Sequence, residues 1–338
     1  MARLADFFPT ILVSLVVAFA SAPLFIRVAT KAGMVDIPDA RPYKWHDTAT
    51  PLAGGLVLAV AILVSILTVA QSSLTAIRPI LAAGAIVLLW GLWDDRSSLP
   101  VWAKLIGQIL AAITLWLGGI LVHLFSIEWL NLLITVFWVV GMLNAFNFID
   151  SMDGLALGLG GIGAAFFMLV TVDSQQPSLA FLCAALVGST VGAAFYNVTP
   201  ARMFIGDSGS QLLGLLLAAV GMAYAPIGLD KAVSWFTPIL VLGVPIFNIT
   251  LVVFSRVWRG VKFYEARRDH LAHRLVDLGL DRSRTVIAMH ITAVVLGLVA
   301  FIALKMSPIG ATLLFGVVVA VGLIAIALLE RGRSPAAA

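Results

Sequence analysis

The stretch Trp129–Ile149, with the sequence WLNLLITVFWVVGMLNAFNFI, decides the fold class of this chain. It holds 21 residues without one Asp, Glu, Lys or Arg, and it lies between Glu128 and Asp150. A helix needs about 20 apolar residues to cross the hydrocarbon core of a bilayer, where backbone groups must be paired within the segment. This stretch therefore predicts a transmembrane helix.

Ten further stretches lack charged residues in the same way. Together the eleven cover residues 7–26, 48–77, 79–93, 105–127, 129–149, 154–172, 174–201, 208–229, 232–255, 285–304 and 306–329. All are long enough to cross a membrane except 79–93, which needs the Arg78 side chain to extend to an interface. We expect an all-α, polytopic integral membrane protein with about 11 transmembrane helices.

Composition excludes other classes of protein. Charged residues make up 11% of the 338 residues, against roughly 25% in soluble domains, and hydrophobic residues make up 61%. Cys183 is the only cysteine, which excludes a disulfide scaffold. A transmembrane barrel would alternate apolar and polar residues, whereas these stretches are apolar throughout.

The distribution of basic residues predicts the orientation in the membrane. With the amino terminus outside, 17 of the 21 Lys and Arg residues face inward, and Arg3, Arg78, Lys231 and Lys305 face outward. Because cytoplasmic loops are enriched in basic residues, the carboxyl terminus is expected in the cytoplasm. We expect one transmembrane domain over residues 1–338. Its active-site segments would lie on the cytoplasmic side, at residues 27–51, 94–104, 144–154, 202–210 and 256–284.

Five carboxylates at membrane level mark a candidate site. Asp94 and Asp95 end the third span, Asp150 and Asp153 follow the fifth, and Asp207 follows the seventh. Acidic groups beside lipid are costly and usually serve a function or have a partner. A single acid could be an interfacial anchor or a helix N-cap, but five on one side favour a common site.

Asn144, Asn147, Asp150 and Asp153 recur at every third position. On a continuous helix the first and last would face opposite ways, so the helix must end or tighten if all four line one cavity. Asp153 could instead be the N-cap of the sixth span, which follows Gly154. Asn and Asp oxygens without nearby His or Cys favour a hard cation such as Mg²⁺.

A basic segment follows the ninth span. His270, His273 and Arg274 are spaced at i, i+3 and i+4, which predicts one face of a helix. Basic groups opposite acids and a cation favour a ligand with several phosphates. The alternative is a loop that touches anionic lipid headgroups.

In their order along the chain, these motifs resemble the polyprenyl-phosphate N-acetylhexosamine-1-phosphate transferase family (the MraY/WecA superfamily). The resemblance rests on Asp36-x-Pro38, Lys44-Trp45-His46, Pro51-x-x-Gly54-Gly55, Asp94-Asp95, Leu99-Pro100, Lys104-Leu105-x-x-Gln108, Asn144-x-x-Asn147-x-x-Asp150-x-x-Asp153-Gly154-Leu155, Phe204-x-Gly206-Asp207 and His270-x-x-His273-Arg274. One departure is Ala272, which stands where related enzymes have a further histidine, and it leaves the identity of the amino sugar open.

The resemblance also implies roles for individual residues. Asp94, Asp95 and Asp150 would be catalytic. Asn147 and Asp207 would hold Mg²⁺, or Mn²⁺ in its place. The residues implied to bind substrate are Lys44, His46, Lys104, Asp153, Phe204, His270, His273 and Arg274.

The implied reaction transfers N-acetylhexosamine-1-phosphate, with GlcNAc-1-phosphate favoured, from a UDP-sugar to polyprenyl (undecaprenyl) phosphate and releases UMP. This would be the first membrane step of cell-envelope glycan synthesis, at the cytoplasmic face of the bacterial inner (plasma) membrane. The expected partners are both substrates and the lipid bilayer, with no nucleic acid, and family members often form homodimers. The alternatives are a phospho-N-acetylmuramoyl-pentapeptide transferase, a secondary transporter and a non-catalytic membrane scaffold.

Overall fold

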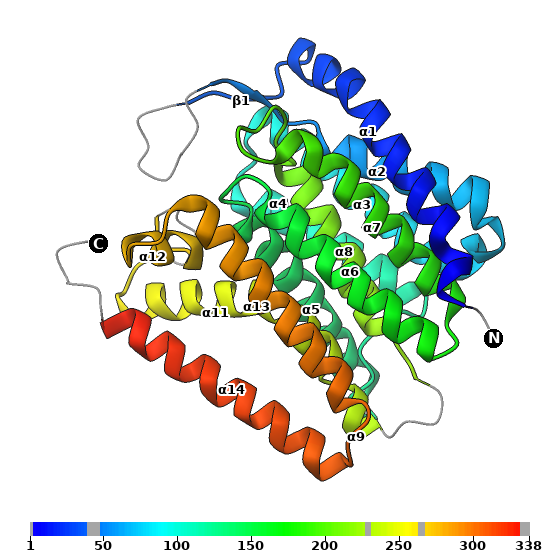
Figure 1. Cartoon of the computed structure of the whole chain (residues 1–338), viewed down its shortest axis with the longest axis vertical. Coiled ribbons are helices and arrows are strands. Elements are labelled where there is room, and N and C mark those ends of the chain that lie inside the picture. Colours follow the sequence, from blue (N-terminus) through cyan, green and yellow to red (C-terminus); the bar gives the residue numbers. More distant parts are fainter. Residues whose placement is uncertain (1–2, 39–47, 227–230, 263–267, 332–338) are drawn as a thin grey trace.

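The computed structural model describes residues 3–38, 48–226, 231–262 and 268–331, which form one bundle of helices (Figure 1). The helices are α1 (Phe8–Lys31), α2 (Gly54–Val69), α3 (Leu74–Ser97), α4 (Val101–Leu117), α5 (Glu128–Ile149), α6 (Leu155–Asp173), α7 (Pro177–Asn197), α8 (Gly206–Ala223), α9 (Lys231–Ser234), α10 (Thr237–Val241), α11 (Gly243–Trp258), α12 (Leu271–Asp277), α13 (Arg282–Ala303) and α14 (Pro308–Arg331). Short 3-10 turns at Leu4–Phe7 and Gln71–Ser73 precede α1 and α3.

Each of the eleven charge-free stretches contains a helix, so the predicted all-α, polytopic membrane fold is confirmed. Within the described ranges, seven helices are long and apolar enough to cross a membrane. They are α5, α6, α7, α13 and α14, together with α1 and α3, each counted with the 3-10 turn before it. The helices α2, α4 and α11 are apolar but shorter. The stretch 79–93 proves long enough, because α3 extends through Arg78 at one end and Asp94–Ser97 at the other.

The ninth stretch differs from a single span, because residues 231–258 fold as α9, α10 and α11. Pro238 lies in the first turn of α10, and Pro245 lies in the first turn of α11. Proline lacks a backbone N–H and is best accommodated in the first turn of a helix, where that N–H would have no partner. The two prolines therefore favour helix starts inside a stretch whose apolar composition alone indicates one helix.

The described strands are two short pairs of residues, β1 (Val35–Asp36) and β2 (Thr50–Pro51), which pair antiparallel. Leu52 then forms a bridge with Phe204, and the Phe204 carbonyl accepts hydrogen bonds from Ala53 and Gly54. This pairing joins the segment after α1 to the segment before α8.

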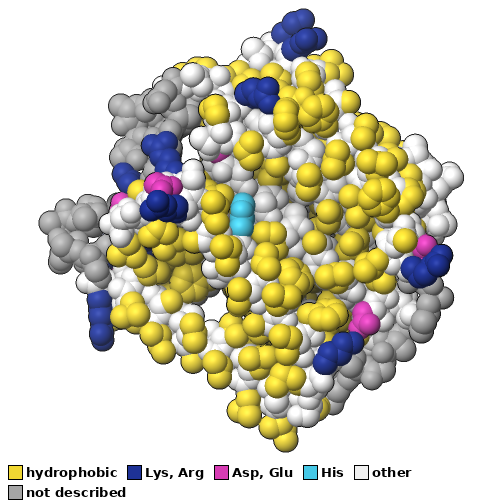
Figure 2. Space-filling model, in the orientation of Figure 1, with side chains coloured by type: hydrophobic (Ala, Val, Ile, Leu, Met, Phe, Trp, Pro, Cys, Tyr) yellow, Lys and Arg dark blue, Asp and Glu magenta, His cyan; other side chains and the backbone are white. Residues whose placement is uncertain are grey.

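Helix α8 is the centre of the bundle and packs against α2, α3, α5 and α6. Every residue from Ser208 to Gly221 is buried. Its polar amino-terminal end, Gly206–Gln211, is thus buried except for the partly exposed Asp207. The outer helices instead expose large apolar side chains, and hydrophobic residues cover much of the face shown in Figure 2. An apolar exterior around a polar interior end is what a bilayer requires.

Candidate active site

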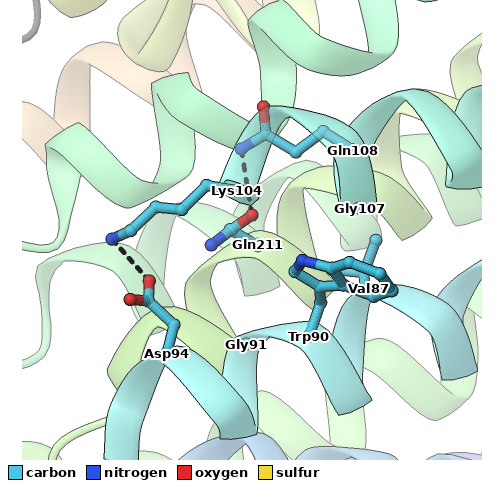
Figure 3. Close-up of a pocket in the computed structure, with 8 residues that line it drawn as sticks. All are labelled: Val87, Trp90, Gly91, Asp94, Lys104, Gly107, Gln108 and Gln211. Atoms are coloured by element: carbon cyan, nitrogen blue, oxygen red, sulfur yellow. Dashed lines mark hydrogen bonds and ion pairs between the residues drawn. The ribbon is translucent and has the colours of Figure 1, made fainter. Parts of the chain in front are cut away.

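Four helices bring Asp94, Lys104, Asn147 and Asp207 together at one end of the bundle. Lys104 Nζ lies 2.6 Å from Asp207 Oδ2 and also forms an ion pair with Asp94 (Figure 3). Asn147 Nδ2 donates to Asp207 Oδ1 at 2.7 Å. The second oxygen of Asp94 accepts the Leu99 backbone N–H at 2.7 Å, which fixes the turn between α3 and α4. The two carboxylates therefore share one ammonium group.

Asp95 lies against the amino-terminal end of α8. Its Oδ1 accepts the Asp207 N–H at 2.7 Å, and its Oδ2 accepts the Ser208 hydroxyl at 2.6 Å and the Ser208 N–H at 3.2 Å. A helix start has unpaired N–H groups and a partial positive charge, so a carboxylate stabilises it. Asp95, predicted as a catalytic acid, caps α8 from another helix and fixes the backbone that carries Asp207.

Glycines allow this close approach. A Cβ at Gly91 would lie 2.4 Å from Ser208 Cα, and one at Gly55 would lie 2.3 Å from the Ser208 hydroxyl. Gly206 has φ of +70°, and a Cβ there would lie 2.7 Å from the Asp95 carboxylate. Any larger residue would separate α2 or α3 from α8.

A layer of three amides, two of them buried, lies one turn deeper. Gln108 follows Lys104 on α4, Gln211 follows Asp207 on α8, and Asn144 precedes Asn147 on α5. Gln108 donates to Gln211 Oε1 at 3.0 Å and accepts from Asn144 Nδ2 at 2.9 Å. Figure 3 shows Gln108 and Gln211 lining a narrow cavity with Asp94, Lys104 and Trp90. We name these three side chains, Gln108, Gln211 and Asn144, the amide layer.

The segment with three-residue spacing breaks its helix as required. Helix α5 ends at Ile149, and α6 begins after Gly154, whose φ is +75°. Asp153 Oδ2 accepts the Ala201 N–H at 3.2 Å, and the N-cap of α6 is Gly154, so the interpretation of Asp153 as that cap is wrong. Burial, and then the negative charges of Asp207, Asp95 and Asp153, raise the pKa of Asp150 well above its usual range.

The segment after α1 reaches the same end of the bundle. Phe204 is half-buried, and its N–H donates to the Pro51 carbonyl at 2.9 Å, so its ring position follows from the β2 connection. Arg96 Nη1 donates to the Ala32 carbonyl at 2.6 Å and ties α3 to the end of α1. Lys44 and His46, both predicted to bind substrate, lie outside the described residues.

The histidine segment packs against α5 at Phe148, the residue after Asn147. The ring centroids of His270 and Phe148, the neighbour of Asn147, are 5.4 Å apart, and those of His270 and His273 are 5.8 Å apart. Helix α12 begins at Leu271, so His270 is its N-cap residue, while His273 and Arg274 lie within it. Burial is the main reason why the pKa of His270 is lowered to about 4, and this histidine is neutral at pH 7.

Arg274 is buried, with 3% of its surface exposed, and donates from Nε to the Asp269 carbonyl at 2.9 Å. Its Nη1 forms an ion pair with Glu330, at the end of α14. Asp269 in turn binds Arg256 through both carboxylate oxygens at 2.8 Å. Burial alone would raise the pKa of Asp269, but the hydrogen bonds and charge of Arg256 outweigh it and lower that pKa.

The Asp207 carboxylate and the Asn147 amide are oxygen ligands of the kind that Mg²⁺ prefers. No group of three or more His, Cys, Asp and Glu side chains is close enough to hold a metal within the described ranges. Mg²⁺ in phosphate-transfer sites is typically held by one or two carboxylates, with water and substrate phosphates as its other ligands. Asp94 and Asp207 already surround one cation, the Lys104 ammonium, and Asn147 adds an amide.

Comparison with the sequences of known proteins identifies the family of this chain. Residues 77–225 match glycosyl transferase family 4, and these residues include Asp94, Lys104, Asn147 and Asp207. The chain is 30% identical to the probable undecaprenyl-phosphate N-acetylglucosaminyl 1-phosphate transferase of Bacillus subtilis, over 86% of this chain and 83% of that protein. The chain belongs to glycosyl transferase family 4. The resemblance to the MraY/WecA superfamily is thereby confirmed.

Two other members of the family bear on the alternatives. The chain is 30% identical to the decaprenyl-phosphate N-acetylglucosaminephosphotransferase of Mycobacterium tuberculosis, over 85% of this chain and 79% of that protein. It is 34% identical to the phospho-N-acetylmuramoyl-pentapeptide-transferase of Lactiplantibacillus plantarum, over 63% of this chain and 74% of that protein. The similarity to the N-acetylglucosamine enzymes thus extends over more of the chain. These names also identify transferases rather than transporters or scaffolds.

Proposed function

We propose that this protein transfers GlcNAc-1-phosphate from UDP-GlcNAc to a polyprenyl phosphate and releases UMP. The observation that carries the proposal is the meeting of Asp94, Lys104, Asn147 and Asp207, from four different helices, at one polar end of an apolar bundle. Relatives that match over most of this chain are named as enzymes of this type.

In the proposed reaction, an oxygen of the acceptor phosphate attacks the phosphorus that carries the sugar. The bond from that phosphorus to the bridging oxygen of the diphosphate breaks, and the bridging oxygen leaves with UMP. Phosphoryl transfer depends mainly on positioning and on stabilising charge. The second pKa of a phosphate monoester is about 6, so the acceptor is largely dianionic at pH 7 and needs little help from a base.

Charged side chains of this chain would position the diphosphate. The Lys104 ammonium, held between Asp94 and Asp207, offers positive charge at the polar end of α4. Asp207 and Asn147 are the proposed Mg²⁺ ligands. When bound, the ion would neutralise charge on the diphosphate and on the leaving group. Asp150 adds a carboxyl group whose pKa is raised first by burial and then by the neighbouring negative charges, and a divalent cation would offset those charges.

The remaining site residues would hold the nucleotide and the sugar. We assign Phe204 to stacking on the uracil ring and Asp153 to the nucleotide. The proposed contacts of the sugar and diphosphate are with His270, His273 and Arg274. Because His270 is neutral at pH 7, it would act by hydrogen bonding rather than by charge.

We further propose that this end of the bundle faces the cytoplasm of a bacterial inner membrane. The inward segments of that orientation carry 17 of the 21 basic residues. A soluble UDP-sugar and the headgroup of a polyprenyl phosphate could meet at that surface.

An assay with purified protein, Mg²⁺, undecaprenyl phosphate and radiolabelled UDP-GlcNAc tests the proposal. We expect UMP release with an equal amount of lipid-linked sugar phosphate, loss of both with EDTA, and loss of both in Asp207→Ala. UDP-MurNAc-pentapeptide, tested in parallel, should be a poor donor. If it reacts faster than UDP-GlcNAc, the muramoyl-pentapeptide alternative is correct. If neither donor reacts, the proposed function is wrong.

A further inference from the structure

Near its end, α14 carries a carboxylate, Glu330, that is mostly covered by protein. Glu330 accepts from Arg274 Nη1 through Oε1 and from Arg259 Nη2 through Oε2, the latter at 2.9 Å. Its side chain is 14% exposed. In Figure 1, α14 runs along the edge of the bundle and ends beside α12. The end of α11, helix α12 and the end of α14 are thus joined at one side chain.

Few buried contacts fix the carboxyl-terminal half of this helix, whereas its first half is held by Phe315, whose ring stacks on that of Phe236 with centroids 5.0 Å apart. Its buried residues are Ala311 and Ile326, and large apolar side chains from Ile309 to Leu328 are exposed. Apolar contact with lipid does not specify how a helix lies along its neighbours, whereas an ion pair away from water does. Glu330 therefore determines where the end of α14 meets the rest of the protein.

From Glu330 the contacts continue into the candidate active site. Arg274 donates to the Asp269 carbonyl at 2.9 Å, and the Asp269 carboxylate binds Arg256. The Arg256 guanidinium lies 5.6 Å from the centroid of the Phe148 ring, and that ring contacts His270. Each end of the segment Asp269–Arg274 is therefore held by an ion pair.

Removing one partner of a buried ion pair leaves the other without compensation for its lost hydration. Without the Glu330 charge, Arg274 would keep only carbonyl partners, at Asp269 and Leu329, among the described residues. Its guanidinium would then gain free energy by turning toward water, and the two histidines lie on the same short segment.

We propose that Glu330 is a positioning residue for the donor site: through Arg274 it holds the segment Asp269–Arg274 so that His270 and His273 face the sugar and diphosphate of the UDP-sugar. This inference rests on the proposed function for the identity of the donor, but not for the contacts themselves. It makes α14, otherwise a helix at the lipid boundary, part of the substrate-binding structure.

Kinetics of the full-length Glu330→Gln variant test the proposal. The KM for UDP-GlcNAc should rise about tenfold, as expected for loss of one charge-assisted hydrogen bond. The KM for undecaprenyl phosphate and kcat should stay within about twofold, because a side chain that acts only through the donor site leaves the acceptor site intact. Arg259→Gln, which removes the other partner of Glu330, should raise the same KM by a smaller factor and remains informative if Glu330→Gln does not fold.

Asp173→Asn is the matched control. Asp173 Oδ2 pairs with Lys305 Nζ at 3.1 Å. This pair ties the end of α6 to the connection between α13 and α14, at the opposite end of α14 from Glu330. The same change from carboxylate to amide should leave the KM for UDP-GlcNAc unchanged there. A folded Glu330→Gln variant with unchanged donor KM would overturn the positioning role. So would an equal rise in the KM values for both substrates, because that would indicate a general structural defect.

Hydrogen–deuterium exchange of residues 268–277 separates this proposal from the proposed function. Exchange in this segment should increase in Glu330→Gln and stay unchanged in Asp173→Asn, whether or not the protein turns over UDP-GlcNAc. If the unmodified protein shows no transfer, the proposed function fails while the exchange result still decides the contact. Unchanged exchange in Glu330→Gln overturns the positioning role.

Discussion

Asp95 illustrates how one carboxylate can fix the backbone that carries a site residue. Both of its oxygens accept hydrogen bonds from the first turn of α8. Asn offers one acceptor oxygen, so Asp95→Asn leaves at least one donor of Asp207 or Ser208 without a partner. We expect this change to cost about 1–3 kcal/mol of stability, and to lower turnover because Asp207 moves with that turn. Thermal unfolding and the transfer assay measure the two effects.

Asp281→Asn is the control for Asp95. Asp281 is exposed and accepts the Arg284 N–H at 2.8 Å, as the N-cap of α13. Asn is as good an N-cap as Asp, so stability and activity should both be retained. If Asp95→Asn lowers activity with no loss of stability, Asp95 acts on substrate rather than on the helix.

His270 predicts a pH dependence of stability. The unfolded chain protonates this histidine near pH 6.5, whereas burial delays protonation in the folded protein until about pH 4. The unfolded state therefore binds more protons between these values, and stability is lost as the pH falls from 6.5 toward 4. Between pH 7.5 and 5 the loss should be about 2 kcal/mol.

Replacing His270 with Gln should remove this part of the pH dependence. Thermal unfolding in detergent at pH 7.5, 6 and 5 measures it, with His123→Gln as the control because His123 is exposed in the connection between α4 and α5. If the unmodified protein and His270→Gln lose stability equally on acidification, the pKa of His270 in the folded protein is the same as in the unfolded chain.

At the scale of helices, the amide layer controls how α4, α5 and α8 meet. Gln108 and Gln211 are 4% and 6% exposed, and Gln108 donates to Gln211 and accepts from Asn144. Gln108→Leu keeps the volume but leaves Gln211 and Asn144 each without one partner, at a cost of about 1–3 kcal/mol. Because Lys104, Asp207 and Asn147 lie one turn away on the same three helices, kcat should fall at least about tenfold, the change expected from a small misplacement of catalytic groups.

The control for the amide layer is Asn131→Leu. Asn131 is buried at the other end of α5, where its Oδ1 accepts the Leu124 and Phe125 N–H groups. It should lower the unfolding temperature to a similar degree without changing kcat. Equal losses of kcat in both variants would mean that the amide layer supports the fold rather than the site.

The sequence predicts helices better than it predicts their contacts. Freedom from charge over about 20 residues is a local property and locates a span by itself. Nine of the eleven stretches each correspond to one helix, whereas 48–77 also holds the first turn of α3 and 232–255 divides among three helices. The break at α9–α11 follows from Pro238 and Pro245, and helix starts at proline are a signal that charge spacing does not use. The positions of Asp94, Asn147 and Asp207 along the chain indicated a common site, because each lies at the polar end of a span.

Contacts between distant segments could not be read from spacing. Asp95 caps a helix more than a hundred residues away, and the glycines at 55, 91 and 206 that allow this approach do not reveal its partner in the sequence. Gln211 could have been found, since it lies one helical turn after Asp207 in an otherwise apolar span. Glu330 could not, because a lone acid at the end of the last span is indistinguishable from an interfacial anchor.

For the molecule as a whole, the orientation in the membrane decides whether the proposed chemistry can meet a cytoplasmic UDP-sugar. The segment between α3 and α4 is proposed to face inward, and the segment between α4 and α5 outward. Ser98 and Ser126 are exposed representatives of these two segments. Cys183, the only cysteine, is buried and can be replaced by Ala to give a cysteine-free background.

In that background, Ser98→Cys and Ser126→Cys should differ in their reaction with a membrane-impermeant maleimide added to intact cells. Only Ser126→Cys should be labelled, and both should be labelled once the membrane is opened with detergent. The two positions flank the single helix α4, so a correct crossing must place them on opposite sides. Labelling of Ser98→Cys alone would mean that the protein has the opposite orientation in the membrane. The carboxylates of the site would then face away from the nucleotide sugars on which the proposed reaction depends.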